Sequence, residues 1–468
     1  MKLYPYQVEG KNRLLHDGRL ILADEMGLGK TVQVLAAIQE RELCALIICP
    51  KTVATVWAYH AKMFNLSYAI VEGSRDERTR IIEDSRKRDI TIINYELVHT
   101  GTDESPRHAL DLMRQKFDVI VVDEAHRIKT RPKRRKDGTQ KGKTVAVILK
   151  LTVKWKCPLV WLLTGTPLDL EPKDAFVLLH VIDKAKWSSA WKFYRLYCEL
   201  EDDGWGTKVS GCKNPELLAH DIEPYVLRRE KKDVAKQLPP KIYNLIPLAL
   251  HPEQEKLYWK TKKATKSLHN LSMDERWQFA DANFMDLRRL CLDPVLIHTG
   301  YKHKSPKAEW LLDFIQDVGS DRIVLFSFFA SWIKRLYILL RDSKFMPGMV
   351  VGGQGFNERQ EELDAFERGD TQVLLTSIRA GGVGLNLQHA RHVVFTDLDY
   401  NPSVNEQAED RLHRIGISVS PNVYHLVHPG TIDQGIYNLV QERRDVNKYI
   451  MDRLAKDTDL DVFVGGGV

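Results

Sequence analysis

The sequence predicts an α/β protein made of two doubly wound lobes, each built on a parallel sheet, and three observations support this fold class. Short apolar runs that end in polar turns alternate with helical patterns in two separate stretches of the chain. The 468 residues are long for one core, and a content of 43% hydrophobic and 28% charged residues is typical of a globular protein. Between the two stretches, at about 170–300, the pattern changes to helical segments rich in Trp, Tyr and Lys. We therefore expect helical protrusions between the lobes.

The expected strands are apolar runs of a few residues, as is usual for strands of a parallel sheet that are buried on both faces. Amphipathic helices are expected at about 310–318 and 332–340, on either side of the first strand of the second lobe. Alternation of this kind produces doubly wound domains. The expected strands are 45–49, 90–93, 119–122 and 159–163 in the first lobe, and 323–328, 373–376 and 393–396 in the second.

The domain boundaries follow from these patterns and from Pro239-Pro240, which marks a break. We expect residues 1–228 to form lobe 1, with a helical protrusion at about 170–225 and a basic loop at 127–143; residues 229–300 to form a link and a second helical protrusion; residues 301–455 to form lobe 2; and residues 456–468 to form a flexible tail.

Composition excludes several classes of protein. The apolar runs are far shorter than the roughly 20 residues that span a bilayer, and the N-terminal stretch MKLYPYQVEGKNRLL lacks the apolar core of a signal peptide. The six cysteines form no C-x-x-C pair, which favours reduced thiols over a zinc site or a disulfide framework. We expect a cytoplasmic monomer that is neither secreted nor bound to a membrane.

Positive charge is concentrated in the basic loop, residues 127–143, RIKTRPKRRKDGTQKGK. It holds nine Lys and Arg against the single acid Asp137, a net charge of +8, so the rest of the chain carries about −2 of the total of +6. A charge run is often only a solvated flexible loop. A dense cationic loop also neutralises phosphates and releases counterions. We therefore expect Lys133, Arg134, Arg135 and Lys136 to contact nucleic acid.

A phosphate-binding loop is predicted in LILADEMGLGKT (20–31), where an apolar strand, glycines and a helix follow in the right order. Gly27 and Gly29 let backbone N–H groups close on phosphates at the start of the helix. Lys30 would reach the β- and γ-phosphates of ATP, and the hydroxyl of Thr31 would bind Mg²⁺. The general pattern has glycine where this chain has Asp24.

Two adjacent carboxylates, Asp123 and Glu124, follow the apolar run 117–122 in the sequence FDVIVVDEAH. An Asp-Glu pair alone is more often a solvated or salt-bridged turn. Beside a phosphate loop, however, Asp123 is placed to bind Mg²⁺ and Glu124 to orient the attacking water.

A cation for the transition state is supplied by Arg411 and Arg414 in QAEDRLHRIG (407–416). Their spacing of three places them on one face of an expected helix. Because this segment lies near the end of the second lobe, the two arginines would complete a composite ATP site when the lobes close.

With these parts in order, the chain resembles a superfamily-2 helicase-like ATPase of the Swi/Snf type, the double-stranded-DNA translocases, which have two RecA-like lobes. Nearly the whole chain takes part in the resemblance. The matching segments are LYPYQVEG (3–10), LADEMGLGKT, IICPKTVATVW (47–57), DEAH, LTGTP (163–167), LRREKKDVAKQLPPK (227–241), TSIRAGGVGLNLQHA (376–390) and QAEDRLHRIG. The chain departs from the family pattern at Ile417, Asp169 and Phe328, where glutamine or asparagine is common.

The resemblance implies further residue roles. Gln7 would recognise the adenine, and Lys51 and Thr52 would touch the DNA backbone, as would Arg379 in the second lobe. Thr164 and Thr166, together with His126 and Gln407, would couple hydrolysis to movement of the lobes. Arg411 and Arg414 would act as arginine fingers.

Three functions compete. The first is a DNA-dependent ATPase that uses ATP and Mg²⁺ to track along double-stranded DNA and remodels DNA or protein–DNA structures. The second is a helicase that separates strands of DNA or RNA, and the third is a nucleic-acid-binding scaffold without catalysis. The intact set of ATP-site residues favours an enzyme. The compact form fits a bacterial or viral origin, and hence a bacterial cytoplasm or that of a viral host.

Overall fold

The computed structural model describes residues 2–444, apart from 100–106, 129–132, 135–139, 142, 155–156, 166–171, 203–206, 235–237, 265–272, 379–386, 415–416 and 443. Internal contacts divide the chain into two compact units, one up to Lys236 and the other from Gln237 to Arg444. In the part of the chain described, no helix has both the length and the apolar character that crossing a membrane requires.

The first unit is built on a seven-stranded sheet in the order β11-β1-β8-β5-β2-β4-β3. Every neighbouring pair in it is parallel. The strands are β1 (Arg19–Leu22), β2 (Ala45–Cys49), β3 (Tyr68–Ile70), β4 (Ile90–Asn94), β5 (Val119–Asp123), β8 (Leu159–Leu163) and β11 (Val226–Leu227).

Helices cover both faces of this sheet. Successive residues of β1 alternate between two cores: Ile21 packs into one and Leu20 and Leu22 into the other. The strands are therefore apolar on both faces, as the sequence predicts. The helices are α1 (Pro5–Asp17), α2 (Lys30–Arg41), α3 (Ala54–Met63), α4 (Arg75–Glu83), α5 (Arg107–Arg114), α6 (Lys143–Leu149), α7 (Ala175–Ile182), α8 (Ala190–Tyr197), α9 (Pro215–Ile222) and α10 (Lys231–Val234).

Two small antiparallel hairpins in the first unit differ from the sequence prediction. In the region expected to be helical, β9 (Cys198–Asp202) pairs with β10 (Thr207–Cys212) after α8. Within the basic loop, β6 (Lys133–Arg134) pairs with β7 (Gln140–Lys141). Both strands of each hairpin are mostly polar, so no apolar run signals them, and pairing between the two strands decides their structure.

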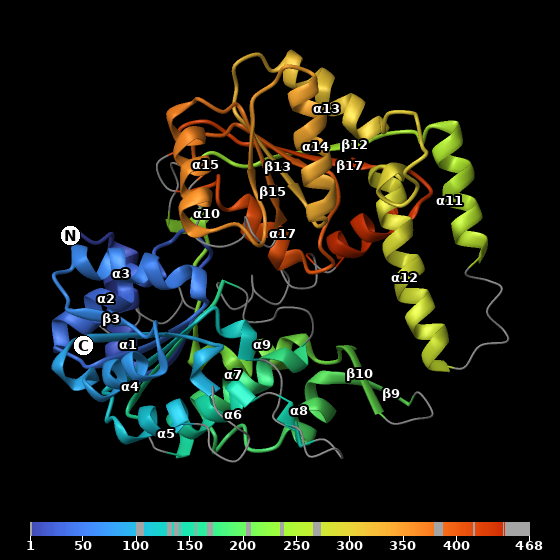
Figure 1. The fold of residues 1–468 in the computed structure, drawn as a ribbon. Helices are drawn as coiled ribbons and strands as arrows, with labels where there is room; N and C mark the ends of the chain where they lie inside the picture. The colour runs from blue at the N-terminus through green and yellow to red at the C-terminus, as the bar shows by residue number, and fades with distance from the viewer. Residues whose placement is uncertain are drawn as a thin grey trace, which may run out of the picture. The chain divides into compact units, whose positions relative to one another are not determined.

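The second unit has a six-stranded sheet in the order β12-β17-β16-β13-β15-β14, again parallel throughout. Its helices are α11 (Pro252–Ala264), α12 (Met273–Leu292), α13 (Pro306–Asp317), α14 (Ala330–Asp342), α15 (Phe356–Arg368) and α17 (Pro402–Glu409). Helices α11 and α12 pack on each other at one end of the unit (Figure 1). The strands are β12 (Ile242–Pro247), β13 (Ile323–Ser327), β14 (Pro347–Val350), β15 (Val373–Ser377), β16 (His392–Phe395) and β17 (Asn422–Val427).

The predicted fold class, α/β with two doubly wound parallel-sheet lobes, is confirmed. All seven predicted strands form, with ends shifted by at most one residue. Of the other six strands, β1 is the strand expected before the phosphate loop, β3 and β11 are apolar but very short, and polar residues, Pro or Gly accompany the apolar residues of β12, β14 and β17. Several are short, and β12, at a sheet edge, leaves Ile242, Tyr243 and Leu245 about half exposed.

Candidate active site

The carboxyl ends of three adjacent strands bring the predicted catalytic segments together in the first unit. Strand β8 lies between β1 and β5, with Leu163 opposite both Leu22 of β1 and Asp123 of β5. The phosphate loop follows β1, Thr164 follows β8, and Glu124 follows β5. In doubly wound sheets, ligands bind outside the carboxyl ends of the strands. Segments far apart in the chain therefore meet at one edge of the sheet.

The phosphate loop has the backbone that anion binding requires. Gly27 and Gly29 have φ of 88° and 76°, a region that glycine adopts without strain, and α2 begins directly afterwards at Lys30. A Cβ on Gly29 would lie 2.5 Å from Nε2 of Gln7. The loop thus turns tightly into the N-terminus of a 12-residue helix, whose N–H groups and dipole favour phosphate.

Lys30 lies among carboxylates. Its Nζ donates to the backbone oxygen of Asp24 at 2.7 Å. Burial lowers the pKa of Lys30, and the negative charges of Asp24, Glu124 and Asp123 oppose that shift. The lysine and the acidic pair therefore act on one another electrostatically at the same edge of the sheet.

Asp123 is held by two hydrogen bonds. The indole Nε1 of Trp57 donates to its Oδ2 at 2.8 Å, and the amide of Glu124 donates to its Oδ1 at 2.9 Å. Burial, and then the charge of Glu124, raise the pKa of Asp123 to about 6. Two neighbouring carboxylates that repel each other in this way are stabilised by a bound cation.

The backbone at Glu124 is strained. Its φ is +52°, which residues other than glycine rarely adopt. The hydroxyl of Tyr95 donates to the backbone oxygen of Asp123 at 2.5 Å and lies 3.3 Å from that of Glu124. Strain of this kind persists only where surrounding contacts enforce it, and it is concentrated at functional sites.

His126 lies between the acidic pair and the end of β8. Its Nδ1 is 3.5 Å from Oε2 of Glu124 and 3.5 Å from the hydroxyl of Thr164. Among the described residues, no group of three or more His, Cys, Asp and Glu could hold a metal ion. A divalent ion held by Asp123, Thr31 and substrate phosphates needs no such cage, because Mg²⁺ is usually bound by one or two carboxylates with phosphates and water.

Gln7 lies beside the phosphate loop, near the start of α1. Its Nε2 donates to the backbone oxygen of Leu28 at 3.3 Å, and its Oε1 accepts from the amide of Tyr4 at 3.0 Å. The structure thus brings Gln7, Gly27, Gly29 and Lys30 to one end of the first sheet.

The two predicted arginines lie in the second unit, where the expectation that they share one face of a helix is wrong. Helix α17 ends at Glu409, so Arg411 and Arg414 belong to the turn that follows it, and Gln407 alone lies within the helix. Burial lowers the pKa of Arg414. The backbone oxygen of Arg411 accepts from the amide of Leu387, which fixes the turn to the chain before β16.

Several predicted DNA contacts lie outside the described residues. These are Arg135, Lys136 and Arg379, together with the coupling residue Thr166 and the side chains of Thr52, Lys133 and Arg134. Lys51, in the turn after β2, is exposed.

Sequence reasoning missed Trp57 and Tyr95, which fix Asp123 and Glu124, and Arg229, which binds Asp24. Trp57 lies in α3 and Tyr95 in the turn after β4, and neither carries a local sign of such a role. For Arg229 a sign existed: an acid where the general pattern has glycine must find a cation if it is buried.

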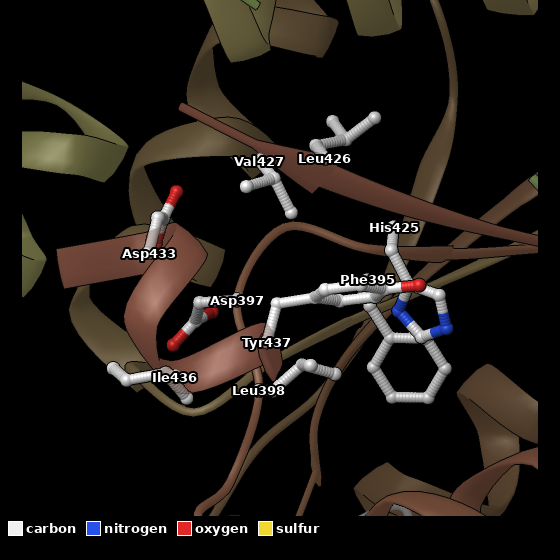
Figure 2. A pocket seen from close by; sticks show the side chains of 9 residues that line it. All are labelled: Phe395, Asp397, Leu398, His425, Leu426, Val427, Asp433, Ile436 and Tyr437. Carbon is white, nitrogen blue, oxygen red and sulfur yellow. The ribbon is translucent and has the colours of Figure 1, made fainter. Parts of the chain in front are cut away.

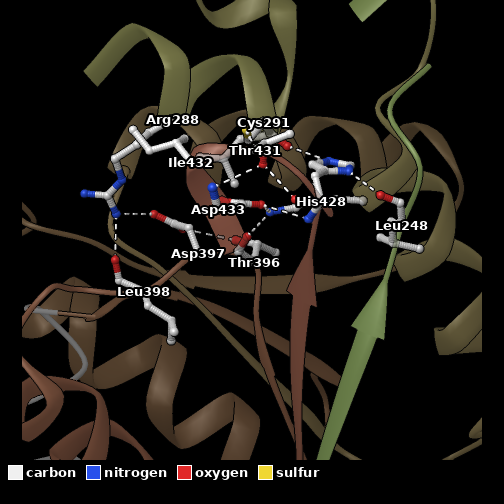
Figure 3. Close-up of polar contacts among 12 residues, drawn as sticks. Leu248, Arg288, Cys291, Thr396, Asp397, Leu398, His428, Thr431, Ile432 and Asp433 are labelled. Atoms are coloured by element: carbon white, nitrogen blue, oxygen red, sulfur yellow. Dashed lines mark hydrogen bonds and ion pairs between the residues drawn. The ribbon is translucent and has the colours of Figure 1, made fainter. Parts of the chain in front are cut away.

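The carboxyl edge of the second sheet carries a buried polar network (Figure 3). Arg288 of α12 donates to Oδ2 of Asp397 at 3.1 Å and to the backbone oxygen of Leu398 at 2.6 Å. Lys307 is fully buried and pairs with Asp433. Each acid therefore has its own cation.

A small cavity borders this network and is lined by Phe395, Asp397, His425, Asp433 and Tyr437, among others (Figure 2). Its volume of about 10 Å³ is the space of a single water molecule. It cannot admit a nucleotide.

Two protein-family models match the chain. The model of the SNF2-related domain matches residues 6–296, and that of the helicase conserved C-terminal domain matches residues 306–416. Their extents correspond to the first unit with the start of the second, and to most of the second sheet.

Curated relatives align over almost the whole chain. A Caenorhabditis elegans protein, the "SWI/SNF-related matrix-associated actin-dependent regulator of chromatin subfamily A-like protein 1 homolog", is 29% identical over 95% of this chain and 61% of its own length. The "DNA annealing helicase and endonuclease ZRANB3" of Bos taurus is 28% identical over 95% of this chain and 40% of its own length. The chain thus spans about two fifths to three fifths of these relatives.

Among solved structures, the chain is similar to the "Sulfolobus solfataricus SWI2/SNF2 ATPase core in complex with dsDNA". That match has 24% identity and a TM-score of 0.43, and it covers 98% of this chain and 95% of the other.

Proposed function

Because this chain belongs to the SNF2-related family, we propose that it is a DNA-dependent ATPase that moves along double-stranded DNA and remodels DNA or protein–DNA structures. One observation carries the proposal: the phosphate loop, the acidic pair and Thr164 meet at the ends of adjacent strands β1, β5 and β8. The names of the relatives, a chromatin regulator and a DNA annealing helicase, support DNA as the substrate.

The residues of the first unit bind and orient ATP. The amides around Gly27 and Gly29 hold the phosphates, with Lys30 on the β- and γ-phosphates, while Gln7 recognises the adenine. Thr31 and Asp123 hold Mg²⁺, which when bound neutralises phosphate charge. Glu124, held by Tyr95 and close to His126, orients the attacking water.

The second unit supplies the remaining cation. Arg411 and Arg414 stabilise charge on the phosphates in the transition state when the two lobes close around ATP. Gln407, His126, Thr164 and Thr166 couple hydrolysis to that movement. In this proposal residues 1–228 and 301–455 act as the two lobes, and residues 229–300 join them.

DNA is held through its phosphates by Lys51, Thr52, Arg379 and the basic loop. Such contacts carry no base information, so binding is independent of the base sequence. The motor moves along the duplex by releasing and rebinding these phosphates repeatedly.

The basic loop is tested by neutralising Lys133, Arg134, Arg135 and Lys136. The slope of log affinity against log salt concentration should become less steep by up to about 3.6, which is about 0.9 for each phosphate that is no longer neutralised. An unchanged slope would show that the loop does not touch DNA.

The decisive experiment measures ATP turnover with duplex DNA, single strands, forks and RNA, beside triplex-displacement and strand-separation assays. We expect stimulation by duplex DNA and displacement of the third strand without separation of the duplex. Separation would instead identify a helicase, and turnover indifferent to nucleic acid would exclude both.

Two substitutions locate the chemistry. Lys30→Ala and Glu124→Gln should each lower turnover by a factor on the order of 10² to 10⁴. Lys62→Ala and Glu83→Gln, on exposed faces of α3 and α4, are the matched controls and should leave turnover unchanged.

A further inference from the structure

The chain between the two sheets is bound at its beginning to the phosphate loop. Strand β11 runs beside β1, and its direction continues along the loop: the amide of Ala23 donates to the oxygen of Leu227 at 2.7 Å, and the amide of Glu25 to that of Arg229 at 2.9 Å. Residues 227–231, which we call the first anchor, therefore run alongside the phosphate loop and bond to it at alternate residues.

Arg229 explains the unusual acid in the phosphate loop. Its guanidinium donates to both carboxylate oxygens of Asp24, from Nε at 2.9 Å and from one terminal nitrogen at 2.6 Å, and that nitrogen also reaches Oε1 of Gln33 at 2.8 Å. Asp24 is fully buried and Arg229 is 8% exposed. A paired, bidentate contact of this kind is strong and geometrically specific.

The side chains around the Arg229–Asp24 pair are tightly packed. A Cβ on Gly10 of α1 would lie 1.8 Å from Oε1 of Gln33 and 2.6 Å from Arg229. Gln33, in the first turns of α2, also donates to Asp24 at 2.9 Å. Because the helix that follows the loop shares the network, a shift of the loop moves Arg229 as well.

Two neighbouring cations strengthen the first anchor. The amide of Lys231 donates to Oε2 of Glu25 at 2.7 Å, and its ammonium lies 3.3 Å from Oε1 of the same side chain. Arg228 donates to the backbone oxygens of Ala23 at 3.2 Å and Gly165 at 3.3 Å. The anchor thus reaches both the phosphate loop and the segment after β8.

A second anchor, residues 239–243, binds the arginine-bearing turn of the second unit. Lys241 Nζ lies 2.9 Å from Oε2 of Glu409 and 2.8 Å from Oδ1 of Asp410. The hydroxyl of Tyr243 donates to Glu409 at 2.8 Å, and a ring nitrogen of His413 lies 2.8 Å from the backbone oxygen of Pro239. These partners surround Arg411 in sequence.

The cluster around Glu409 is ionic and closed to solvent. The Glu409 side chain is 0% exposed and also binds Arg444 at 2.6 Å. Burial opposes the charge of Lys241, but Asp410 and Glu409 raise its pKa well above the ordinary value. Removing one partner of a buried pair leaves the other charge uncompensated. Loss of Lys241 would remove one cation from both Glu409 and Asp410 and leave Arg444 on Glu409.

We propose that Arg229 and Lys241 are positioning residues of the ATPase: Arg229 holds the phosphate loop through Asp24, and Lys241 holds the arginine-bearing turn through Glu409 and Asp410. The same short segment of chain, residues 227–243, thereby connects the residues that bind the nucleotide with those that stabilise its transition state. This inference rests on the proposed function, and it adds a covalent route by which the nucleotide at the loop influences the arginines.

The two anchors should give different kinetic signatures. Arg229→Lys keeps the charge but removes the bidentate geometry, so the affinity for a fluorescent ADP analogue should fall about 10-fold, the value of one charged hydrogen bond. Lys241→Met should lower kcat about 10-fold or more while affinity for the analogue stays within about twofold, because the arginines act in the transition state. Lys241→Arg should restore most of kcat.

Matched controls separate positioning from general stability. Arg368→Lys on α15 and Lys256→Met on α11 change exposed side chains outside both anchors and should change neither quantity. Should Lys241→Met fail to fold, Tyr243→Phe removes a single hydroxyl from Glu409 and tests the same cluster with a smaller fall in kcat. Thermal unfolding is measured for every variant.

The outcomes are distinguishable. The role of Arg229 is overturned if the wild type hydrolyses ATP and Arg229→Lys leaves the affinity for the analogue intact. The role of Lys241 is overturned if Lys241→Met and Tyr243→Phe lower affinity and kcat in parallel with the melting temperature. If the wild type binds the analogue but shows no turnover with any DNA, the proposed function fails; Arg229→Lys then still decides the first anchor by affinity alone.

Discussion

The carboxyl edges of the two sheets make an instructive contrast. At the first edge, Asp123 and Glu124 are neighbours, burial and the charge of Glu124 raise the pKa of Asp123, and the backbone at Glu124 is strained. At the second edge, Asp397 is paired with the buried Arg288 (Figure 3), and Asp433 is paired with the buried Lys307. The same architecture thus carries an incompletely neutralised acidic pair at one edge and a neutralised network at the other. We infer that the first edge is built to receive a cation and its ligand, and the second to fix helices to the sheet.

Exchanging the acids for amides at the two edges should separate these roles most strongly. Asp397→Asn leaves Arg288 buried without its carboxylate, so the free energy of unfolding should fall by about 3–5 kcal/mol. Chemical denaturation measures it. Asp370→Asn, which removes an exposed acid paired with Arg368, is the control and should cost less than about 1 kcal/mol. If Asp397→Asn lowers the free energy of unfolding no more than the control does, the second edge does not have the stabilising role that distinguishes it from the first.

The converse is expected at the first edge, where Asp123→Asn should abolish turnover yet raise stability at pH 8 by on the order of 1–2 kcal/mol. The folded-state pKa of Asp123, about 6, is above its ordinary value of 3.8, so the stabilisation due to its protonated form is complete below pH 3.8 and lost as the pH rises through 6. The amide keeps that stabilisation. Adding Mg²⁺ with ADP should raise the melting temperature of the wild type more than that of the variant. Equal shifts would show that Asp123 does not hold the ion.

A pH dependence should come from the second unit. His425 stacks on Phe395, with ring centroids 5.3 Å apart, neither ring nitrogen has a hydrogen-bond partner among the described residues, and burial lowers its pKa to about 4. Stability from the neutral ring is complete above its ordinary pKa of 6.5 and is lost as the pH falls from 6.5 through 4. The slope there should be up to about 1.4 kcal/mol per pH unit. His425→Leu should flatten this part of the unfolding profile, and an unaltered slope would contradict the assignment.

The smallest effect concerns Phe328, at a position where the resemblance suggests glutamine. Its ring faces the guanidinium of Arg288 at 4.4 Å, with Tyr400 at 4.8 Å. A double-mutant cycle with Arg288→Met and Phe328→Leu should give a coupling free energy of about 0.5–1 kcal/mol. A value near zero would mean that the ring serves only as packing.

The sequence predicted the seven strands that are continuous apolar runs, because burial on both faces leaves a mark in consecutive residues. It missed β12 and β17, in which polar residues interrupt the run, and the hairpin of β9 and β10, which has no apolar signal. The helix predicted at Arg411 and Arg414 was wrong, since α17 ends earlier, at Glu409. The spacing of the two arginines does not show where the helix ends and the turn begins.

What the sequence determined by itself is local: the glycines and Lys30 of the phosphate loop, the acids at the end of β5, and the basic loop that follows them. Only the tertiary structure decided which distant groups complete these segments. Arg229 reaches Asp24 across 205 positions of the chain, and Trp57 reaches Asp123 across 66. The positive φ of Glu124 is likewise enforced by Tyr95, which is remote in sequence. The physical reason is that a buried charge or a strained residue is stabilised by whatever the fold brings to it, and consecutive residues do not specify those partners.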